Sequence, residues 1–296
     1  MSDIRISSDI DECKSLWKKA IEPKCLFDLW EVRSCFQKHF NRKPYFIVLE
    51  RDGELHGLLP LSYIEETDSY AYFPGETHKH KTWLEQNIIF AKDEDVYREL
   101  IDSIPNNSHI RYLVSVTDEV DEIKYFFFPP NYSYNIENYW QEFSGKSRKK
   151  LKEEMDSIKS LGIEWRIDDP NDIQKFIEMN IGTFGEYSYY SGEKFRNAFL
   201  ELIDFLRENN YLRIVTAVVN GEIAAVDMGT IYNGTYTLLA GGTNANYRGI
   251  AKVININHME WACENKMLAV DFLCGDFGWK ERFHLVGVPL SQIRKN

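Results

Sequence analysis

Two stretches of the sequence, FIVLERDGELHGLLPL (46–61) and IVTAVVNGEIAAVDMG (214–229), share one pattern. In each stretch an apolar run precedes a Gly-Glu pair and a second apolar run follows it. Apolar runs on both sides of a short glycine-containing turn indicate a β-hairpin. The turn glycines are Gly53 and Gly221, so the numbering of the two copies differs by 168.

A third strand follows each hairpin in the same register, because the same offset places YAYFPG (70–75) on LLAGGT (238–243). Three strands in one register are hard to attribute to chance, and a repeat of this length predicts a duplicated domain. Each copy is expected to run helix, helix, three strands, helix, strand. Apolar spacing predicts helices at 10–20, 26–40 and 97–104 in the first copy and at 173–179, 195–208 and 253–265 in the second, with closing strands at 111–116 and 268–274.

Composition is that of a globular protein. The 296 residues suffice for about two domains at roughly 150 residues each. Hydrophobic residues make up 44% and aromatic residues 14% of the chain, which excludes a disordered protein. No apolar run approaches the roughly 20 residues of a membrane span, and the first residues, MSDIRISSDIDECK, lack the apolar core of a signal peptide. A cytoplasmic protein without an integral membrane segment is therefore expected.

The five cysteines are odd in number and form no CxxC pair, so neither a disulfide framework nor a zinc site is predicted. His78 and His80 with Glu76 have too few accompanying ligands to indicate a metal. Cys274 is expected to be a buried structural thiol. The sequence thus predicts reduced thiols and no metal.

A net charge of −11 opposes binding to DNA or other long nucleic acids, since phosphate binding depends on clustered lysine and arginine. The basic stretch KSRKKLK (146–152) is a local exception. It begins a helical pattern that runs to Leu161, and Gly162 is the expected stop. The stretch is either a solvated helix start or a basic edge that faces an anionic substrate.

The segment FPPNYSYNIENYWQEF (128–143) fits neither copy, and its proline and asparagine content favours a connector. We therefore expect domains at 1–143 and 144–296. In the first copy the residues after the third strand, HKHKTWLEQN (78–87), contain no glycine, so the backbone could not approach a phosphate closely there. The first domain is expected to lack a donor site and to shape the acceptor cleft.

A meander of three strands followed by a helix and a parallel strand resembles the GNAT acyltransferase fold. NANYRGIA (244–251) opens the next helix and is similar to the GNAT donor loop Q/R-x-x-G-x-G/A, with Asn246, Gly249 and Ala251 at its fixed positions. Small residues let the backbone approach a pyrophosphate, and free amides at a helix start bind it. The resemblance implies an acyl-CoA donor site formed by Asn246, Tyr247, Arg248, Gly249, Ile250 and Ala251.

A second resemblance covers most of the chain. KSRKKLKEEMDSIKSLGIEWRI (146–167) and VDFLCGDFGWKERF (270–283) are similar to acyltransferases related to cellulose-synthesis accessory proteins and to FemAB-type peptidoglycan transferases. Those families are tandem GNAT folds, which implies an α/β protein with mixed sheets and two GNAT-like domains packed together. They typically show Gly-Asp followed by Tyr-Lys or a similar pair, which here is Trp279-Lys280.

Acyl transfer to an amine needs a base for the amine proton and a donor to the oxyanion. Asp276, directly after the last strand, and Asp227, inside the strand AAVDMG, are the candidate bases. Asp276 could instead cap a turn, and Asp227 could be a buried, hydrogen-bonded carboxylate. Lys280 could neutralise the oxyanion or the donor phosphates, or it could be an ordinary surface lysine. Arg248 could pair with a phosphate or remain solvated.

The stretch GEYSYYSG (185–192) lies between two predicted helices. Its polar and aromatic side chains could wall the acceptor pocket, or its tyrosines could pack where the domains meet. The substrate-binding residues expected from the sequence are Glu186, Tyr187, Tyr189, Tyr190 and Trp279. His258 and Glu260, in the helix after the donor loop, are expected at the helix surface.

The predicted function is acyl-CoA-dependent transfer of an acyl group, without a metal, to an amino group of a sugar, polysaccharide or peptidoglycan-like acceptor. Two alternatives stay open: a FemAB-like transferase that uses an aminoacyl-tRNA, and a non-catalytic scaffold of a polysaccharide assembly system. Asn246 stands where the GNAT pattern has glutamine or arginine, which favours the scaffold. The sequence determines neither the acyl chain nor the oligomeric state.

Overall fold

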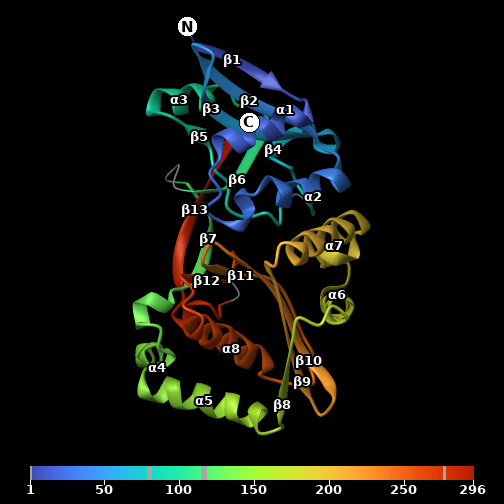
Figure 1. Ribbon diagram of the computed structural model, residues 1–296, viewed down its shortest axis with the longest axis vertical. Coiled ribbons are helices and arrows are strands. Elements are labelled where there is room, and N and C mark those ends of the chain that lie inside the picture. The colour runs from blue at the N-terminus through green and yellow to red at the C-terminus, as the bar shows by residue number, and fades with distance from the viewer. Residues whose placement is uncertain (1, 79–81, 115–118, 276–277) are drawn as a thin grey trace. The chain divides into compact units, whose positions relative to one another are not determined.

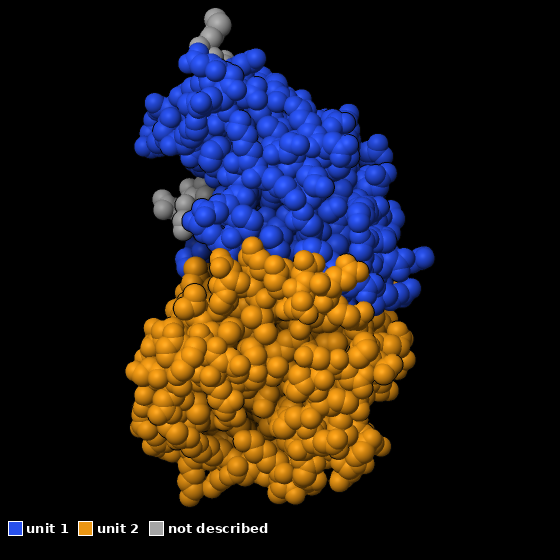
Figure 2. All heavy atoms as spheres, in the orientation of Figure 1, with its two compact units in different colours: residues 1–123, 192–205, 289–296 blue, residues 124–191, 206–288 orange. Residues whose placement is uncertain are grey.

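The computed structural model describes residues 2–78, 82–114, 119–275 and 278–296. The chain forms two compact units, neither of which is one continuous stretch (Figure 2). Unit 1 comprises residues 1–123, 192–205 and 289–296, and unit 2 comprises residues 124–191 and 206–288. The domain boundary expected near residue 143 stays a prediction.

Unit 1 contains a mixed sheet. Its strands, in spatial order, are β1 (Ser2–Ser7), β2 (Lys43–Arg51), β3 (Glu54–Ile64), β4 (Ser69–Tyr72), β6 (Ser108–Val114) and the end of β13 (Val286–Lys295), with β5 (Phe90–Ala91) beside β3. Strands β4 and β6 are parallel, and the other pairs are antiparallel. The helical segments are α1 (Ile10–Ala20), η1 (Leu26–Asp28), α2 (Trp30–Phe40), η2 (Glu65–Thr67), α3 (Glu94–Asp102) and most of α7 (Glu193–Glu208).

Unit 2 has the same strand arrangement (Figure 1). Its strands are β8 (Ile163–Ile167), β9 (Leu212–Val219), β10 (Glu222–Tyr232), β11 (Thr235–Thr243), β12 (Ala269–Asp271) and the end of β7 (Val120–Phe127). Only β11 and β12 are parallel among the pairs of these described strands. The helical segments are η3 (Pro129–Tyr132), α4 (Ile136–Tyr139), η4 (Trp140–Glu142), α5 (Gly145–Lys159), α6 (Asp172–Phe184), η5 (Gly185–Tyr187), η6 (Tyr189–Ser191), α8 (Ile250–Glu264) and η7 (Glu281–Phe283). Across the described ranges, no helix has the length and apolarity to cross a membrane.

The repeat predicted from the two hairpins is confirmed. Adding 168 to the bounds of β3 gives 222 and 232, which are the bounds of β10. The turn glycines have positive φ angles, 76° at Gly53 and 79° at Gly221, and the residues before them, Asp52 and Asn220, are also left-handed. Asp-Gly and Asn-Gly are the pairs that two-residue turns of this geometry favour, so local sequence specifies both hairpins.

Each unit receives a strand from a distant part of the sequence. Strand β7 follows β6 along the chain, yet its end pairs with β12 in unit 2, where Val270 lies opposite Phe127. The last strand, β13, returns to unit 1 and pairs with β6, where Leu290 lies opposite Val114. Both pairings complete the sheet of the unit that contains them.

Helices α6 and α8 cover opposite faces of the sheet in unit 2. Neighbouring residues of a strand point to opposite faces. A Cβ atom on Gly242 would lie 3.3 Å from Phe176 of α6, whereas one on Gly241 would overlap the Asp227 side chain, which contacts α8. Figure 1 shows α5 beside α8, and the two helices are in contact.

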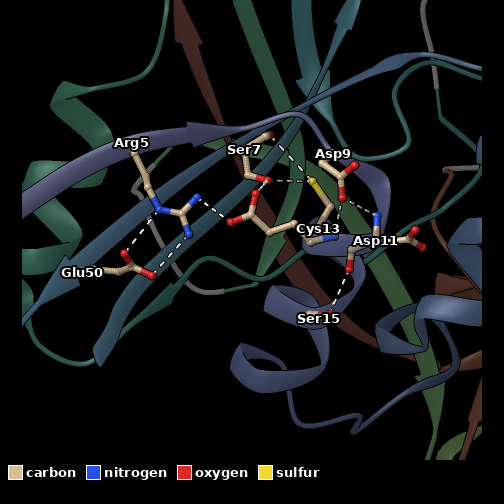
Figure 3. Close-up of polar contacts among 8 residues, drawn as sticks. Arg5, Ser7, Asp9, Asp11, Cys13, Ser15 and Glu50 are labelled. Atoms are coloured by element: carbon tan, nitrogen blue, oxygen red, sulfur yellow. Dashed lines mark hydrogen bonds and ion pairs between the residues drawn. The ribbon is translucent and has the colours of Figure 1, made fainter. Parts of the chain in front are cut away.

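Polar contacts fix the junction of β1 and α1 (Figure 3). Asp9 caps α1, because its Oδ1 accepts hydrogen bonds from the amides of Asp11 at 3.1 Å and Glu12 at 2.8 Å. Arg5 on β1 donates to Glu50 on β2. The Sγ of Cys13 lies 3.6 Å from the Ser7 hydroxyl, and burial raises the pKa of the thiol to about 11. The first strand is thus tied to both of its neighbours.

Several elements differ from the sequence prediction. The predicted helix 26–40 is divided at Leu29, whose ψ of 126° is extended. Strands β1, β5, β7, β8 and β13 are absent from the prediction. The connector 128–143 is largely helical, and it buries Tyr139, Trp140 and Phe143 in the core of unit 2. Proline and asparagine begin these short helical turns instead of preventing them, because Pro occupies the first turn of η3 and Asn135 caps α4.

Candidate active site

Strands β11 and β12 separate within unit 2. They pair only from Thr235 to Thr237, although β11 continues to Thr243. Within the described ranges, residues 238–243 have no neighbouring strand on that side. Such an edge presents backbone amides and carbonyls to which an extended ligand can hydrogen-bond.

Helix α8 begins just after this open edge, and its N-terminus is uncapped. Gly249 is the N-cap residue, with a φ of 101° that favours glycine, and no side chain caps the helix. The first turn contains no acidic residue. Among the described residues, nothing accepts a hydrogen bond from the backbone amides of Arg248, Gly249 and Ala251. Free amides at a helix N-terminus form a binding site for an anion.

Three other residues of the predicted donor loop, Asn246, Tyr247 and Ile250, make hydrogen bonds that hold it in place. The Tyr247 hydroxyl donates to the Glu222 carboxylate at 2.8 Å, and this hydrogen bond raises the pKa of the phenol. Ile250 is buried, and its amide donates to the carbonyl of Tyr247 at 3.1 Å. Asn246 and Arg248 are exposed, and the amide of Asn246 donates to the Asn244 side chain at 3.0 Å.

A cavity of about 560 Å³ lies between α5, α8 and the segment that follows β12. Its lining includes Lys150 and Glu154 of α5, Ala251, Lys252 and Asn255 of α8, and Trp279, Arg282 and His284 of the last segment. Three cations and one carboxylate make it electropositive, although Lys252 is paired with Glu154. The uncapped turn of α8 opens on this cavity through Ala251.

The cavity brings together Ala251 and Trp279 of the predicted site. Trp279 is half-buried and packs edge-on against Phe272, with ring centroids 5.6 Å apart. Sequence reasoning missed Lys150, Lys252 and Arg282 as individual residues. The basic stretch 146–152 signalled the first of them, and Lys252 directly follows the last residue of the donor-loop pattern.

Lys280 is not a surface lysine, so that alternative is wrong. The residue is 3% exposed, and its ammonium donates to the carbonyls of Leu273 and Cys274, each at 2.8 Å. The ammonium also lies 5.3 Å from the centroid of the Tyr125 ring. Lys280 therefore holds the turn that leaves β12. Cys274, expected to be buried, is half-buried.

Of the two predicted bases, Asp276 lies outside the described residues. Asp227 lies in β10, and its Oδ2 is 3.0 Å from Nε2 of His258 on α8. The prediction that His258 lies at the helix surface is wrong, because its side chain is fully buried. Buried residues lie on several faces of α8. A single apolar stripe in the sequence therefore does not predict which of its positions are exposed. Glu260 is half-buried, and burial raises the pKa of its carboxyl group.

The predicted acceptor residues occupy the two short turns η5 and η6. Glu186 and Tyr187 are exposed, and Tyr189 is half-buried. Tyr190 is buried, with its ring 4.9 Å from that of Phe176, and burial raises its pKa well above the usual value. None of these described side chains lines the cavity beside α8. Their role in binding an acceptor stays a prediction.

The corresponding part of unit 1 is built differently. Helix α3 begins at residue 94, far along the chain from the end of β4 at residue 72, whereas α8 begins at residue 250, soon after β11 ends at residue 243. Asp93 caps α3, and Glu94 and Asp95 lie in its first turn. Carboxylates at a helix N-terminus satisfy its amides and repel a phosphate.

Comparisons with known proteins agree with this geometry. Residues 145–281 match the model of the acetyltransferase (GNAT) domain family. No curated protein sequence matches the chain. Solved structures resemble it over nearly its whole length, at sequence identities that show the fold alone.

Three such structures illustrate the likeness. A conserved protein of unknown function from Bacteroides thetaiotaomicron VPI-5482 has 14% identity and a TM-score of 0.58, over 98% of each chain. FemX has 11% identity and a TM-score of 0.59, over 97% of this chain and 96% of that one. L-PGS from Bacillus licheniformis has 11% identity and a TM-score of 0.54, over 98% of this chain and 93% of that one.

The open edge of β11, the uncapped α8 and the family match define the class of this protein: it is an acyltransferase with a mixed α/β fold. More narrowly, residues 145–281 match the GNAT domain family, and the whole chain has the GNAT-type, FemAB-like fold that FemX shares.

Proposed function

We propose that the protein transfers an acyl group from acyl-CoA to an amino group of a sugar, polysaccharide or peptidoglycan-like acceptor. One observation carries the proposal: the free amides at the start of α8 open on a cavity that also contains Lys150, Lys252 and Arg282. Phosphate groups bind where backbone amides, a helix dipole and flexible cations converge. The donor site proposed here belongs to unit 2.

The bound donor would extend from the start of α8 to the free edge of β11. Its pyrophosphate would accept hydrogen bonds from the free amides at the start of α8, those of Arg248, Gly249 and Ala251, and would pair with Lys150 and Arg282. Its extended arm would lie along the free edge of β11, where residues 238–243 offer backbone groups for hydrogen bonding. The thioester would then lie next to β11, with Lys280 fixing the turn on the far side of the opening.

An aminoacyl-tRNA is the alternative donor that the FemAB resemblance implies. The exposed start of α5 favours it, because Lys146 and Lys149 extend the basic surface beyond the cavity. The net charge of −11 opposes it. A scaffold without catalysis would bind neither donor.

The acceptor proposal depends on the resemblance and on exposed side chains of the turn η5. Tyr187 is 70% exposed, and Glu186 is exposed beside it. An aromatic ring and a carboxylate suit a glycan that carries an amine, since the ring packs on the sugar and the carboxylate attracts the ammonium group.

A thermal-shift series with CoA, acetyl-CoA and uncharged tRNA tests the donor. A ligand at 100 times its dissociation constant stabilises a protein by about 2.7 kcal/mol. We expect CoA and acetyl-CoA to raise the melting temperature of the native protein. A rise with tRNA alone would replace acyl-CoA by the alternative donor, and no rise with either would refute the donor site.

Two matched variants locate the site. Lys150→Gln removes a charge that lines the cavity, whereas Lys149→Gln removes one from the neighbouring position, whose side chain is 78% exposed. A charge-assisted hydrogen bond contributes about 1.5–3 kcal/mol, so Lys150→Gln should weaken CoA binding roughly 10- to 100-fold. Lys149→Gln should leave it within about twofold. Equal losses in both variants would mean that CoA binds by general surface charge.

A further inference from the structure

A buried polar chain runs from α8 into the sheet of unit 2. His258 is fully buried, and its Nε2 lies 3.0 Å from Oδ2 of Asp227 while its Nδ1 lies 3.0 Å from the hydroxyl of Tyr236. The guanidinium of Arg213 on β9 lies 6.0 Å from the centroid of the Tyr236 ring. Burial raises the pKa of Tyr236, so its hydroxyl keeps its proton and can donate to Nδ1. The other nitrogen, Nε2–H, then donates to Asp227.

The far end of this chain reaches the surface. Asp227 is 9% exposed, and no described residue donates to its second oxygen, Oδ1. Gly241 lies directly opposite on β11, where a Cβ atom would overlap Oδ1. Glycine at this position therefore leaves room for the carboxylate beside the strand.

The position of Gly241 connects the carboxylate with the proposed donor site. Gly241 belongs to the part of β11 that has left β12, and it precedes Asn244, the first residue of the donor loop, by three positions. At a rise of about 3.3 Å per residue, the carboxylate lies roughly 10 Å along the strand from that loop. The phosphates of the donor would bind at the loop itself. The thioester at the other end of the extended arm would lie at about the distance of the carboxylate.

We propose that Asp227 is the general base of the acyl transfer and that His258 and Tyr236 are positioning residues which hold it. This inference rests on the proposed function. A buried histidine that served only packing would need no carboxylate partner. A carboxylate that served only the histidine would not need its second oxygen placed beside Gly241, in the part of β11 that has left β12.

The proposed transfer is a direct attack of the acceptor amine on the thioester. The amine nitrogen of the acceptor attacks the thioester carbonyl carbon, and a C–N bond forms. Asp227 Oδ1 takes one proton from that nitrogen. The C–S bond breaks, its electron pair leaves with the sulfur of CoA, and the proton passes from Asp227 to that sulfur. The products are an amide and free CoA, and Asp227 is again a carboxylate.

Kinetic variants test the roles separately, with acetyl-CoA, D-glucosamine and detection of the released thiol. Asp227→Asn should lower kcat/KM about 100- to 10,000-fold, the range of a general base. His258→Phe and Tyr236→Phe should lower kcat and shift the acidic limb of the pH profile while leaving the KM for acetyl-CoA unchanged. His258→Gln, which can still donate to Asp227, should recover part of the loss. Tyr72→Phe in unit 1, which also removes one buried hydroxyl, is the control for lost stability.

Labelling with a water-soluble carbodiimide measures the accessibility of the Asp227 carboxylate without requiring turnover. The carbodiimide should modify Asp227 in the native protein, and bound acetyl-CoA should prevent that modification. In Gly241→Ala the backbone can accept alanine, but the new methyl group would clash with Oδ1. The carboxylate should therefore be displaced in this variant. Absence of modification at Asp227, or Asp227→Asn turnover within twofold of the native rate, overturns the base role alone. Modification without any effect of acetyl-CoA, together with no thermal shift, refutes the donor site and the base role with it.

Discussion

Replacing Lys124 by methionine should destabilise the protein severely. Lys124 and Asp271 form an ion pair of 2.8 Å inside unit 2, and their side chains are only 1% and 3% exposed. Removal of one partner leaves a buried charge without its counterion, which costs about 3–5 kcal/mol. Domains are stable by about 5–15 kcal/mol in total, so Lys124→Met would remove at least about a fifth of that free energy of unfolding.

Loss of the Lys124–Asp271 ion pair should also affect the proposed donor site. Asp271 ends β12, and its second oxygen accepts a hydrogen bond from the amide of Leu273 at 2.9 Å. The same turn supplies the carbonyls that bind Lys280. A freed Asp271 carboxylate would draw water into this turn and loosen the opening between β11 and β12.

Urea denaturation at neutral pH measures this loss. Lys149→Met is the matched control, because its pair with Glu153 spans 3.8 Å and both side chains are mostly exposed. Such a surface pair contributes about 0–1 kcal/mol. The double variant Lys124→Met/Asp271→Leu should recover most of the stability, since no unpaired charge remains. A loss below about 1 kcal/mol in Lys124→Met would refute the reasoning, because it would mean that the carboxylate is solvated.

The remaining predictions concern Gly249 and the thiols. Gly249→Ala should lower the free energy of unfolding by about 1–2 kcal/mol, the cost of a left-handed alanine, and should also weaken CoA binding. Gly221 in the hairpin has a φ of 79°, so Gly221→Ala should lower stability by a similar amount but leave CoA binding intact. Calorimetry with CoA measures the binding of both variants. Burial raises the pKa of Cys13 and Cys263 to about 11, so a maleimide at pH 8 should label the half-buried Cys25 and Cys274 in the native protein and not these two. A raised pKa keeps the Cys13 thiol protonated in the folded protein. Its contribution to stability is therefore complete below the pKa of the unfolded thiol, about 8.5, and is lost as the pH rises towards 11. In denaturation experiments at a series of pH values, the stability difference between the native protein and Cys13→Ala should shrink over this interval.

The hairpins and the helices next to them could be predicted from the sequence because local chemistry specifies them. Asp52-Gly53 and Asn220-Gly221 adopt the left-handed turn that those pairs favour, and the apolar runs on both sides form the strands. The donor loop could be found for the same reason, since its position between a strand and a helix depends on neighbours in the sequence.

What the sequence could not reveal depends on distant partners. The ends of β7 and β13 are short stretches whose pairing partners lie far away along the chain, and the end of β13, LSQIRK, is mostly polar. His258 resembles a surface residue until β10 supplies Asp227 and β11 supplies Tyr236. Lys280 resembles a solvated lysine until the turn after β12 surrounds it with carbonyls. In each case the deciding contact comes from another element, so no local pattern contains it.

The return of β13 to unit 1 sets the order in which the protein can mature during synthesis. Strand β6 ends at Val114, and the first residue that pairs with it is Leu290, close to the end of the chain. At about 5–20 residues per second, synthesis of the chain between these two positions takes roughly 10–35 s on the ribosome. Throughout that time β6 has one edge open, and an open strand edge is a template for pairing with another chain. Until residues 290–295 have been made, β13 cannot cover that edge of β6.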